Sequence, residues 1–308
     1  MADTHTLPMV VVHGGAGGDK QDEDGCRAAA QAGLNKLHEG QDALAAAVGA
    51  VVVLEDDGRF NAGSGAVLCL DGCTVELDAA VMDTRGTLGA VACLRRVKNP
   101  VLVAQAVAAS PHWLLAGEGA ERFARTAGFA PHLAIGEKPR ARHAQLMRQL
   151  DQAEAVLPGI DNGAFARHWN YAVPYGATPS APRADGACDT VGAVARDQEG
   201  HFAVACSTGG SAPSLLGRVG DTPIIGSGFY AGPHGAVAVT GIGEHIVRHL
   251  LAFSVYQWMA QGVPLYQALR RGVDLFDTRV DVGLIAIGRD DAGSLSNRPM
   301  PVGEARHG

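Results

Sequence analysis

The chain changes character at Thr190. Residues 157–189 have no sustained hydrophobic periodicity and are rich in proline, glycine and alanine, whereas residues 191–195 read Val-Gly-Ala-Val-Ala. A short apolar run of this kind is typical of a buried strand. Structureless stretches longer than about 15 residues are uncommon inside a compact domain and are usually functional or disordered. The sequence therefore predicts a processing linker up to Asp189 and a buried strand directly after Thr190.

A threonine in this position has a specific chemical use. If the peptide bond before Thr190 is cut, the new α-amine lies beside the threonine's own hydroxyl and can act as its base. One residue then supplies both the nucleophile and the base. Because threonine is common in strands, this position alone does not distinguish a nucleophile from an ordinary strand residue.

Three glycine-rich segments follow Thr190, and each lies at or just beyond a strand-like run or in a loop between such runs. They read CSTGG at residues 206–210, GRVGD at residues 217–221 and VTGIGE at residues 239–244. Two similar segments lie upstream, HGGAG at residues 13–17 and NAGSG at residues 61–65. Because strand ends are where sheets present chemistry, we expect these segments to meet at one site.

In this order, the five segments resemble the plant-type asparaginase/isoaspartyl peptidase family of N-terminal-nucleophile (Ntn) hydrolases, over roughly residues 9–287. The resemblance implies an α+β fold, a four-layer αββα sandwich in which two helix layers enclose two sheets. It also implies cleavage between Asp189 and Thr190. Residues 1–189 would become an α subunit that ends in the linker, about residues 157–189, and residues 190–308 a β subunit. Together they would form one domain.

The resemblance assigns catalytic roles. Thr190 would be the nucleophile, and Thr208 the second threonine, whose hydroxyl tunes it. Thr240 and Gly241 would form the oxyanion hole from a hydroxyl and a backbone N–H, and Asn61 would orient the threonine amine or the cleavage site. Hydrolysis of an amide needs these parts, namely a nucleophile, a base and donors for the tetrahedral oxyanion.

Arg218 and Asp221 are expected to bind substrate, next to Gly241. Three residues apart in a glycine-flanked loop, a guanidinium and a carboxylate can hold the α-carboxylate and α-ammonium of an aspartyl unit. The alternative is a surface ion pair of little energetic value, but the flanking Gly217 and Gly220 suggest close backbone approach and favour a binding role. The expected substrates are L-asparagine and β-aspartyl dipeptides, because their scissile bond is at the side-chain carbonyl.

No cofactor is expected for catalysis. The resemblance implies a structural sodium ion bound by backbone carbonyls in residues 54–64. The carbonyls would be those of Leu54, Glu55, Asp57, Phe60, Ala62 and Ser64. The resemblance also implies a homodimer of the two-subunit unit.

Three positions depart from the family pattern. Asp189 stands where plant-type asparaginases have glycine and resembles the aspartylglucosaminidases, which leaves a glycosylasparaginase as an alternative, although HGGAG favours the asparaginase branch. Ser214 replaces a usual lysine, and residues 297–300 read Asn-Arg-Pro-Met instead of the family's ending. We expect both changes to alter the pocket rim and the leaving group. An unprocessed homologue that binds aspartate without hydrolysis is a second alternative.

Composition sets the remaining expectations. The formal net charge is −7 with no basic stripe, which disfavours nucleic acid and anionic membranes as partners. No leader and no run of about 18 apolar residues is present, so the expected location is cytoplasmic. The six scattered cysteines favour free thiols, although Cys69 and Cys73 could pair across a hairpin.

Periodicity predicts the remaining elements. Strands are expected at residues 9–12, 74–82, 88–97, 191–195, 202–207, 236–239 and 282–287. Helices are expected at residues 26–38, 42–54, 100–109, 112–126, 142–155, 244–261 and 265–276, of which 142–155 is charged and solvent-facing. Strands grouped with strands and helices with helices suggest stacked layers.

Overall fold

A computed structural model of the chain describes residues 7–132, 136–152, 161, 163–174 and 190–307. It contains two sheets, and apart from the parallel β3–β4 pair their neighbouring strands are antiparallel. The larger sheet has the order β11-β1-β5-β6-β2-β3-β4. Its strands are β1 (Met9–His13), β2 (Leu77–Asp83), β3 (Leu88–Leu94), β4 (Leu114–Ala116), β5 (Val191–Arg196), β6 (Phe202–Thr208) and β11 (Val302–Arg306).

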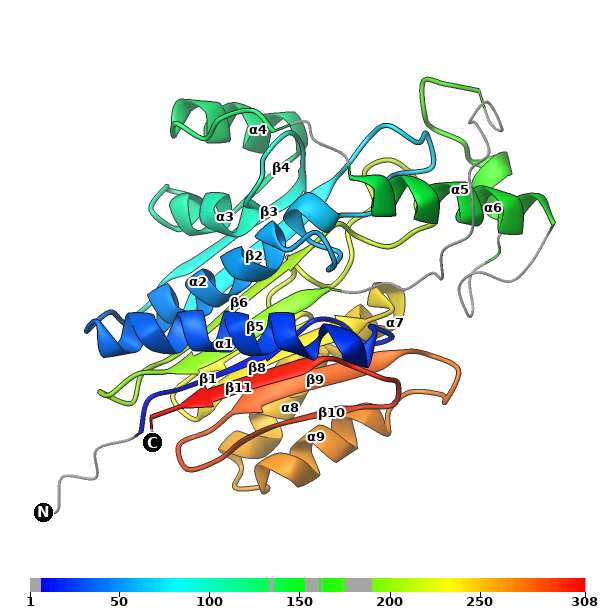
Figure 1. Cartoon of the computed structure of the whole chain (residues 1–308). Coiled ribbons are helices and arrows are strands. Elements are labelled where there is room, and N and C mark those ends of the chain that lie inside the picture. Colours follow the sequence, from blue (N-terminus) through cyan, green and yellow to red (C-terminus); the bar gives the residue numbers. More distant parts are fainter. Residues whose placement is uncertain (1–6, 133–135, 153–160, 162, 175–189, 308) are drawn as a thin grey trace, which may run out of the picture.

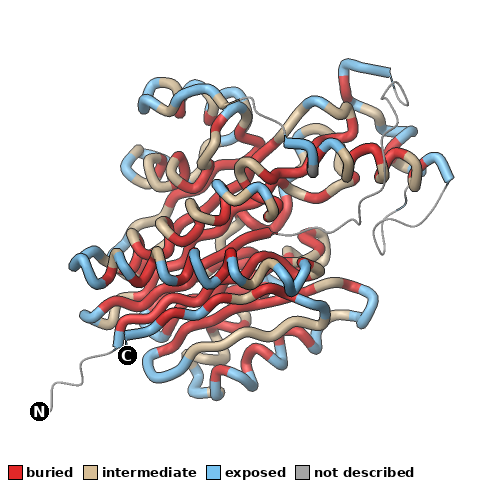
Figure 2. The backbone as a smooth tube through the Cα atoms, in the orientation of Figure 1, coloured by how far each residue is buried: buried red, intermediate tan, exposed pale blue. Residues whose placement is uncertain are grey.

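The smaller sheet has the order β10-β9-β8-β7. Its strands are β7 (Phe229–Gly232), β8 (Gly235–Gly241), β9 (Val282–Ile287) and β10 (Ala292–Ser296). Successive side chains of a strand point to opposite faces, so a strand between two apolar layers must be apolar throughout. In β5, Val191, Ala193 and Ala195 pack with the helices, whereas Val194 packs between the sheets. Figure 2 shows the central strands buried along their length.

Helices cover the outer face of each sheet (Figure 1). The larger sheet packs against α1 (Glu23–His38), α2 (Ala43–Asp56) and α3 (Pro100–Ala108) through one apolar cluster. The smaller sheet packs against α8 (Leu251–Ala260) and α9 (Leu265–Val273) through another, and a third lies between the sheets. This mixed α/β fold with two sheets fits the expected α+β class.

Most strands and helices predicted from the sequence are found with ends shifted by a few residues, but two predicted helices are partly wrong. Residues 112–126 contain β4 and then α4 (Gly117–Thr126), because Leu114–Ala116 pairs with β3. Residues 244–261 form α7 (Gly243–His249) and α8, because Leu250 between them has a left-handed backbone with φ of 44°. Three strands were missed, β7, β10 and β11.

A third correction concerns α5 (Glu137–Asp151), which we expected to face solvent. Its residues Leu146, Met147 and Leu150 are buried in a small cluster outside the two sheets. The cluster also includes Tyr171 and a residue of α6 (Gly163–Arg167), a helix within the stretch predicted to lack structure. This cluster, called the α5–α6 cluster below, consists of Cys69, Leu70, Leu146, Met147, Leu150, Phe165 and Tyr171. It fixes the last described part of the chain before Thr190.

Two further expectations concern the thiols and membranes. Cys26, Cys69, Cys73, Cys93 and Cys206 are free thiols, and Cys69 and Cys73 do not pair with each other. Cys188 lies outside the described residues. In the part of the chain that the structure describes, no helix is long and apolar enough to cross a membrane.

Two glycines test the packing of α3 on the larger sheet. A Cβ at Gly89 in β3 would lie 2.2 Å from the carbonyl oxygen of Ala104 in α3, whereas one at Gly119 in α4 would meet nothing within 4 Å. Gly89→Ala should therefore lower the free energy of unfolding by about 1–3 kcal/mol. The matched control Gly119→Ala should raise it by about 0.5–1 kcal/mol, because it removes a flexible residue from a helix. Urea denaturation measures both, and a harmless Gly89→Ala would contradict this packing.

Candidate active site

Thr190 and Thr208 meet at the ends of two paired strands. Thr190 precedes β5, Thr208 ends β6, and the pairing of Val191 with Ser207 places them side by side. Thr190 is 6% exposed, and its Oγ1 donates a hydrogen bond to Thr208 Oγ1 at 3.2 Å. Thr208 Oγ1 also accepts the Gly210 N–H at 3.0 Å. The predicted nucleophile is therefore buried and held by the residue predicted to tune it.

Asn61 braces the turn that follows Thr208. Its Nδ2 donates to the Gly210 carbonyl at 2.7 Å, and its own carbonyl accepts the Gly209 N–H at 3.0 Å. Its Oδ1 accepts the Val67 N–H at 2.9 Å. Among the described residues, these hydrogen bonds connect Asn61 to Thr190 only through the turn, so the side chain is placed to position Thr208.

Thr240 and Gly241 end β8, in the smaller sheet. The Thr240 side chain is fully buried, and its Oγ1 accepts the Ala16 N–H at 3.2 Å. A hydroxyl that accepts one hydrogen bond can still donate its proton to another acceptor. Gly241 has φ of 140°, and a Cβ there would lie 2.2 Å from the Asp281 carbonyl oxygen, so only glycine fits.

The glycine-rich segment at residues 13–17 forms the floor beside Thr190. A Cβ at Gly192 would lie 2.4 Å from Nε2 of the fully buried His13. Burial lowers the pKa of His13 to about 3, and the nearby Thr190 backbone partly offsets this, so the ring is neutral. Gly14 N–H and Gly17 N–H donate to carbonyls of residues 301 and 299 at 2.9 and 2.8 Å. Residues 299 and 301, within and just after the stretch that departs from the family ending, thus hold residues 13–17 in place.

Arg218 and Asp221 converge around Gly243. Arg218 Nε and Nη2 donate to the two carboxylate oxygens of Glu244, each at 2.8 Å. A Cβ at Gly243 would lie 2.9 Å from both Arg218 Nη2 and Asp221 Oδ1, and one at Gly210 would lie 4.0 Å from Arg218 Nη1. The predicted substrate-binding pair therefore sits together, next to the turn that follows Thr208.

The surroundings of the Asp221 carboxyl favour the binding of a positively charged group. Asp221 is 3% exposed, and burial raises its pKa to about 7, while Arg218 opposes the rise. Its Oδ2 has no hydrogen-bond partner in the described part of the chain. A buried, unpaired carboxylate oxygen is costly unless a ligand pairs with it. An ammonium group would supply the missing donor.

Glu76 and Asp78 lie beside the site and were not predicted there, whereas His13 and Glu244 belong to glycine-rich segments that were predicted to meet at it. Glu76 accepts the Gly217 N–H at 2.7 Å, and burial raises the pKa of Asp78 to about 6, against the opposing effects of the Cys93 N–H and Arg218. Two acidic residues spaced by two in an otherwise apolar strand run were a usable signal, because such residues share one face of the strand.

The carbonyls predicted to hold sodium lie in the turn after α2. The carbonyls of Asp57, Phe60 and Ala62 accept hydrogen bonds from within the turn, at 3.2, 2.9 and 3.0 Å. A Cβ at Gly65 would lie 2.1 Å from the Phe60 carbonyl oxygen and 2.7 Å from that of Gly58, so oxygens converge there. Leu54 and Glu55 belong to the last turn of α2, and burial raises the pKa of the Glu55 side chain to about 8.

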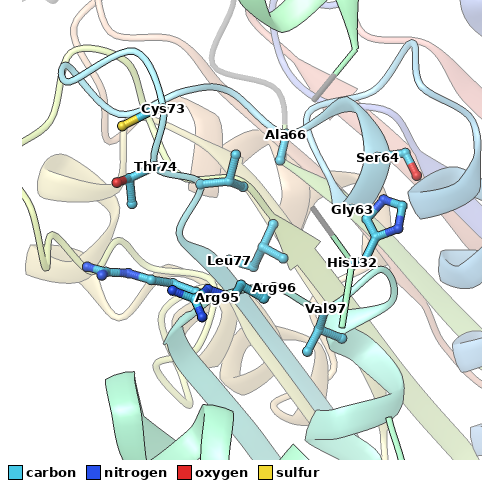
Figure 3. A pocket seen from close by; sticks show the side chains of 11 residues that line it. Gly63, Ser64, Ala66, Cys73, Thr74, Leu77, Arg95, Arg96, Val97 and His132 are labelled. Carbon is cyan, nitrogen blue, oxygen red and sulfur yellow. The ribbon is translucent and has the colours of Figure 1, made fainter. Parts of the chain in front are cut away.

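A cavity of about 260 Å³ is lined in part by the end of this turn. Figure 3 shows Ser64 and His132 at one end of it, and Cys73 and Thr74 at the other. It is lined by Gly63, Ser64, Ala66, Cys73, Thr74, Val75, Leu77, Arg95, Arg96, Val97 and His132. None of the predicted catalytic or substrate-binding residues lines it.

A buried threonine at the start of a strand, beside a second threonine and between two facing sheets, fits the class of Ntn hydrolases. A family profile described as Asparaginase matches residues 6–299, and the chain belongs to this family.

Curated relatives carry two names. Isoaspartyl peptidase/L-asparaginase of Macaca fascicularis is 35% identical over 98% of this chain and 94% of its own length. The protein of the same name from Danio rerio is 39% identical over 89% and 83%. Plant-type L-asparaginase of Pyrococcus abyssi is 38% identical over 87% and 85%.

The buried carboxyl of Asp221 should make stability depend on pH. Its pKa is raised from 3.8 to about 7, so the folded protein favours the protonated form, and the stability this gives is lost as pH rises from about 4 to about 7. Asp221→Asn removes this loss. The variant should therefore gain about 3 kcal/mol relative to wild type between pH 5 and pH 8. Urea unfolding at the two pH values measures the gain, and a constant difference would contradict the raised pKa.

Proposed function

We propose that this protein is a self-cleaving hydrolase that acts on L-asparagine and β-aspartyl dipeptides. One observation carries the proposal: the buried Thr190 hydroxyl is hydrogen-bonded to Thr208 at 3.2 Å, next to a turn in which a Cβ at Gly210 would lie 4.0 Å from Arg218. The names of the relatives, isoaspartyl peptidase/L-asparaginase and plant-type L-asparaginase, support the same activity.

The first proposed reaction is cleavage of the chain itself. Thr190 Oγ attacks the Asp189 carbonyl carbon, the hydroxyl proton passes to the Thr190 nitrogen, and the C–N bond breaks to leave an ester. Water then hydrolyses the ester and releases residues 1–189 and 190–308. Asp189 lies outside the described residues, whereas Thr190 stands at the start of β5. The two fragments would stay together as one αββα sandwich, since β5 lies between β1 and β6.

The second proposed reaction is substrate turnover. The freed α-amine of Thr190 has a reference pKa near ~8, which allows it to accept the Oγ proton at working pH. Oγ attacks the side-chain carbonyl of the substrate, and the proton passes from the amine to the leaving nitrogen. Ammonia or an amino acid departs, and water hydrolyses the β-aspartyl ester to release aspartate and restore the hydroxyl.

Thr240 and Gly241 would stabilise the tetrahedral oxyanion. Thr240 Oγ1 is held by the Ala16 N–H at 3.2 Å, which directs its own proton elsewhere, and Gly241 contributes its N–H. Donors fixed before the reaction need no reorganisation in the transition state, and the loss of one costs roughly 3–4 kcal/mol. Asn61 would act on this centre by bracing Thr208.

Substrate choice would follow from the Arg218 and Asp221 pair. Arg218, fixed by Glu244, would bind the α-carboxylate, and the unpaired Oδ2 of Asp221 would accept the α-ammonium. With both main-chain charges bound there, the side-chain carbonyl is the group left to face Thr190. This geometry selects β-linkages.

Two alternatives remain to be separated by assay. Asp189 favours a glycosylasparaginase, and the same residue together with the long linker favours an aspartate-binding protein that is not processed. A panel of asparagine, β-Asp-Leu, β-Asp-Arg and an N-glycosylated asparagine distinguishes the activities. Preference for the glycosylated substrate would support the first alternative. Calorimetric binding of aspartate with no product formed from any substrate would support the second.

The proposed sodium ion would be held by the turn after α2. Among the described residues, no cluster of three or more His, Cys, Asp and Glu side chains is placed to hold a metal, so carbonyl oxygens would be the ligands. The convergence of the Gly58 and Phe60 carbonyls at Gly65 supports such a site. Replacing sodium with choline at equal ionic strength should lower the thermal unfolding midpoint by a few degrees, as expected when a bound ligand is removed. An unchanged midpoint would argue against the ion.

We also propose a homodimer of the two-fragment unit, on the family resemblance. Native mass measured by light scattering tests this directly. A mass of 31.7 kDa, that of one chain, would contradict it.

Substitutions at Thr190 test the central proposal. Thr190→Ala removes the hydroxyl, so denaturing mass spectrometry should show one intact chain, and hydrolysis of asparagine should be lost. Thr190→Ser keeps the hydroxyl and should still cleave, more slowly. Wild type should give two fragments, residues 1–189 and residues 190–308. The proposal would be overturned by an active enzyme that consists of one uncut chain, or by cleavage of Thr190→Ala.

A further inference from the structure

We propose that Asn170 and Tyr171 are positioning residues for the substrate-binding Arg218, a role that rests on the proposed function. Both lie in the last described segment before Thr190, and both contact the backbone of residues 214–216, immediately before the Gly217-Arg218 pair. In the proposed cleaved enzyme, the α fragment would therefore help to set the substrate affinity of the β fragment.

Asn170 forms a reciprocal pair of hydrogen bonds with Leu216. Its Nδ2 donates to the Leu216 carbonyl at 2.9 Å, and its Oδ1 accepts the Leu216 N–H at 3.0 Å. A side-chain amide bonded in this way replaces the partner strand that a loop residue lacks. Two simultaneous bonds fix both the position and the direction of that peptide unit.

Tyr171 holds the same segment two residues earlier. Its hydroxyl donates to the Ser214 carbonyl at 2.7 Å and accepts the Leu70 N–H at 3.4 Å. Tyr171 is 7% exposed and belongs to the α5–α6 cluster, against which Leu215 and Leu216 pack. Because the contact uses the carbonyl of Ser214, it is available although this chain lacks the lysine side chain usual in the family.

The segment needs these contacts because glycine follows it. Gly217 has φ of 82°, and a Cβ there would meet no described residue within 4 Å, so side-chain packing does not restrain it. Its N–H donates to Glu76 at 2.7 Å, which restrains the backbone from the side of β2. Asn170 and Tyr171 restrain it from the opposite end. The backbone of Arg218 therefore starts from a fixed point, from which its side chain reaches Glu244.

Other contacts connect the two restraints. Arg95 donates to Glu76 at 2.7 Å, and His143 of α5 bonds to the Leu70 carbonyl at 3.1 Å. Leu70 in turn donates its N–H to Tyr171. Residues 69–76 are therefore connected to the substrate-binding loop in two places. Leu70 contacts Tyr171, which holds Ser214, and Glu76 accepts the Gly217 N–H. Loosening one side should shift Arg218 without disturbing Thr190, whose partners lie on β6.

The test compares Asn170→Ala, Tyr171→Phe and the double variant with wild type, each after cleavage is complete by mass spectrometry. The KM for L-asparagine should rise about tenfold in the double variant, as expected for the loss of hydrogen bonds that restrain the binding group. The value of kcat should change by less than about twofold, because the Thr190 contacts remain. Asn35→Ala, an exposed asparagine of α1, and Tyr266→Phe, an exposed tyrosine, are matched controls that should behave as wild type.

Two outcomes would overturn the proposal. One is an unchanged KM in the double variant. The other is a fall in kcat with constant KM, which would place the contacts at the reacting centre. A purely structural role would lower the thermal unfolding midpoint and leave KM unaltered.

If wild type hydrolyses none of the substrates, the proposed function fails and not this inference. Calorimetric binding of aspartate then tests it instead, with a Kd that should be about tenfold weaker in the double variant.

Discussion

The pairing of β5 between β1 and β6 is the interaction on which the site depends. It sets Thr190 beside Thr208, and it sets His13 beside Gly192. A shift of one residue in either register would turn the threonine side chain to the helix-covered face, because neighbouring side chains in a strand point to opposite faces. The apolar residues of β5 oppose such a shift, since they are buried on both faces. The large core therefore has a local effect: it holds one hydroxyl in place.

Around this fixed hydroxyl, the protein keeps an excess of negative charge beside one arginine. Glu244, Asp78 and Asp221 all lie close to Arg218, and the last two have raised pKa values because they are buried. Such an arrangement is unfavourable in an empty site. The ammonium group of the proposed substrate would relieve it by pairing with Asp221, whereas an uncharged amide would not. The proposed selectivity and this unfavourable arrangement of charges would thus have the same origin.

The sequence was sufficient to predict candidate catalytic and binding residues that the structure brings close together, but not the contacts that restrain them. Thr190, Thr208, Thr240, Arg218 and Asp221 stand in glycine-rich segments, most of them at strand ends, where a pattern is visible in one dimension. Glu76 and Glu244 act through partners 141 and 26 positions away, which only the folded chain defines. Burial of α5 was missed for a similar reason, because its apolar residues face a cluster assembled from distant segments. The break between α7 and α8 at Leu250 was missed because no proline or glycine marks it in the sequence.

The position of β11 has a consequence for the timing of synthesis. This strand pairs with β1, and the carbonyls of Pro299 and Pro301 hold the glycine segment that follows β1. The loop after β1 therefore depends on residues 299–306, which follow it by almost 290 positions in the sequence. A ribosome must therefore release residues 299–306 before this loop can be held beside Thr190.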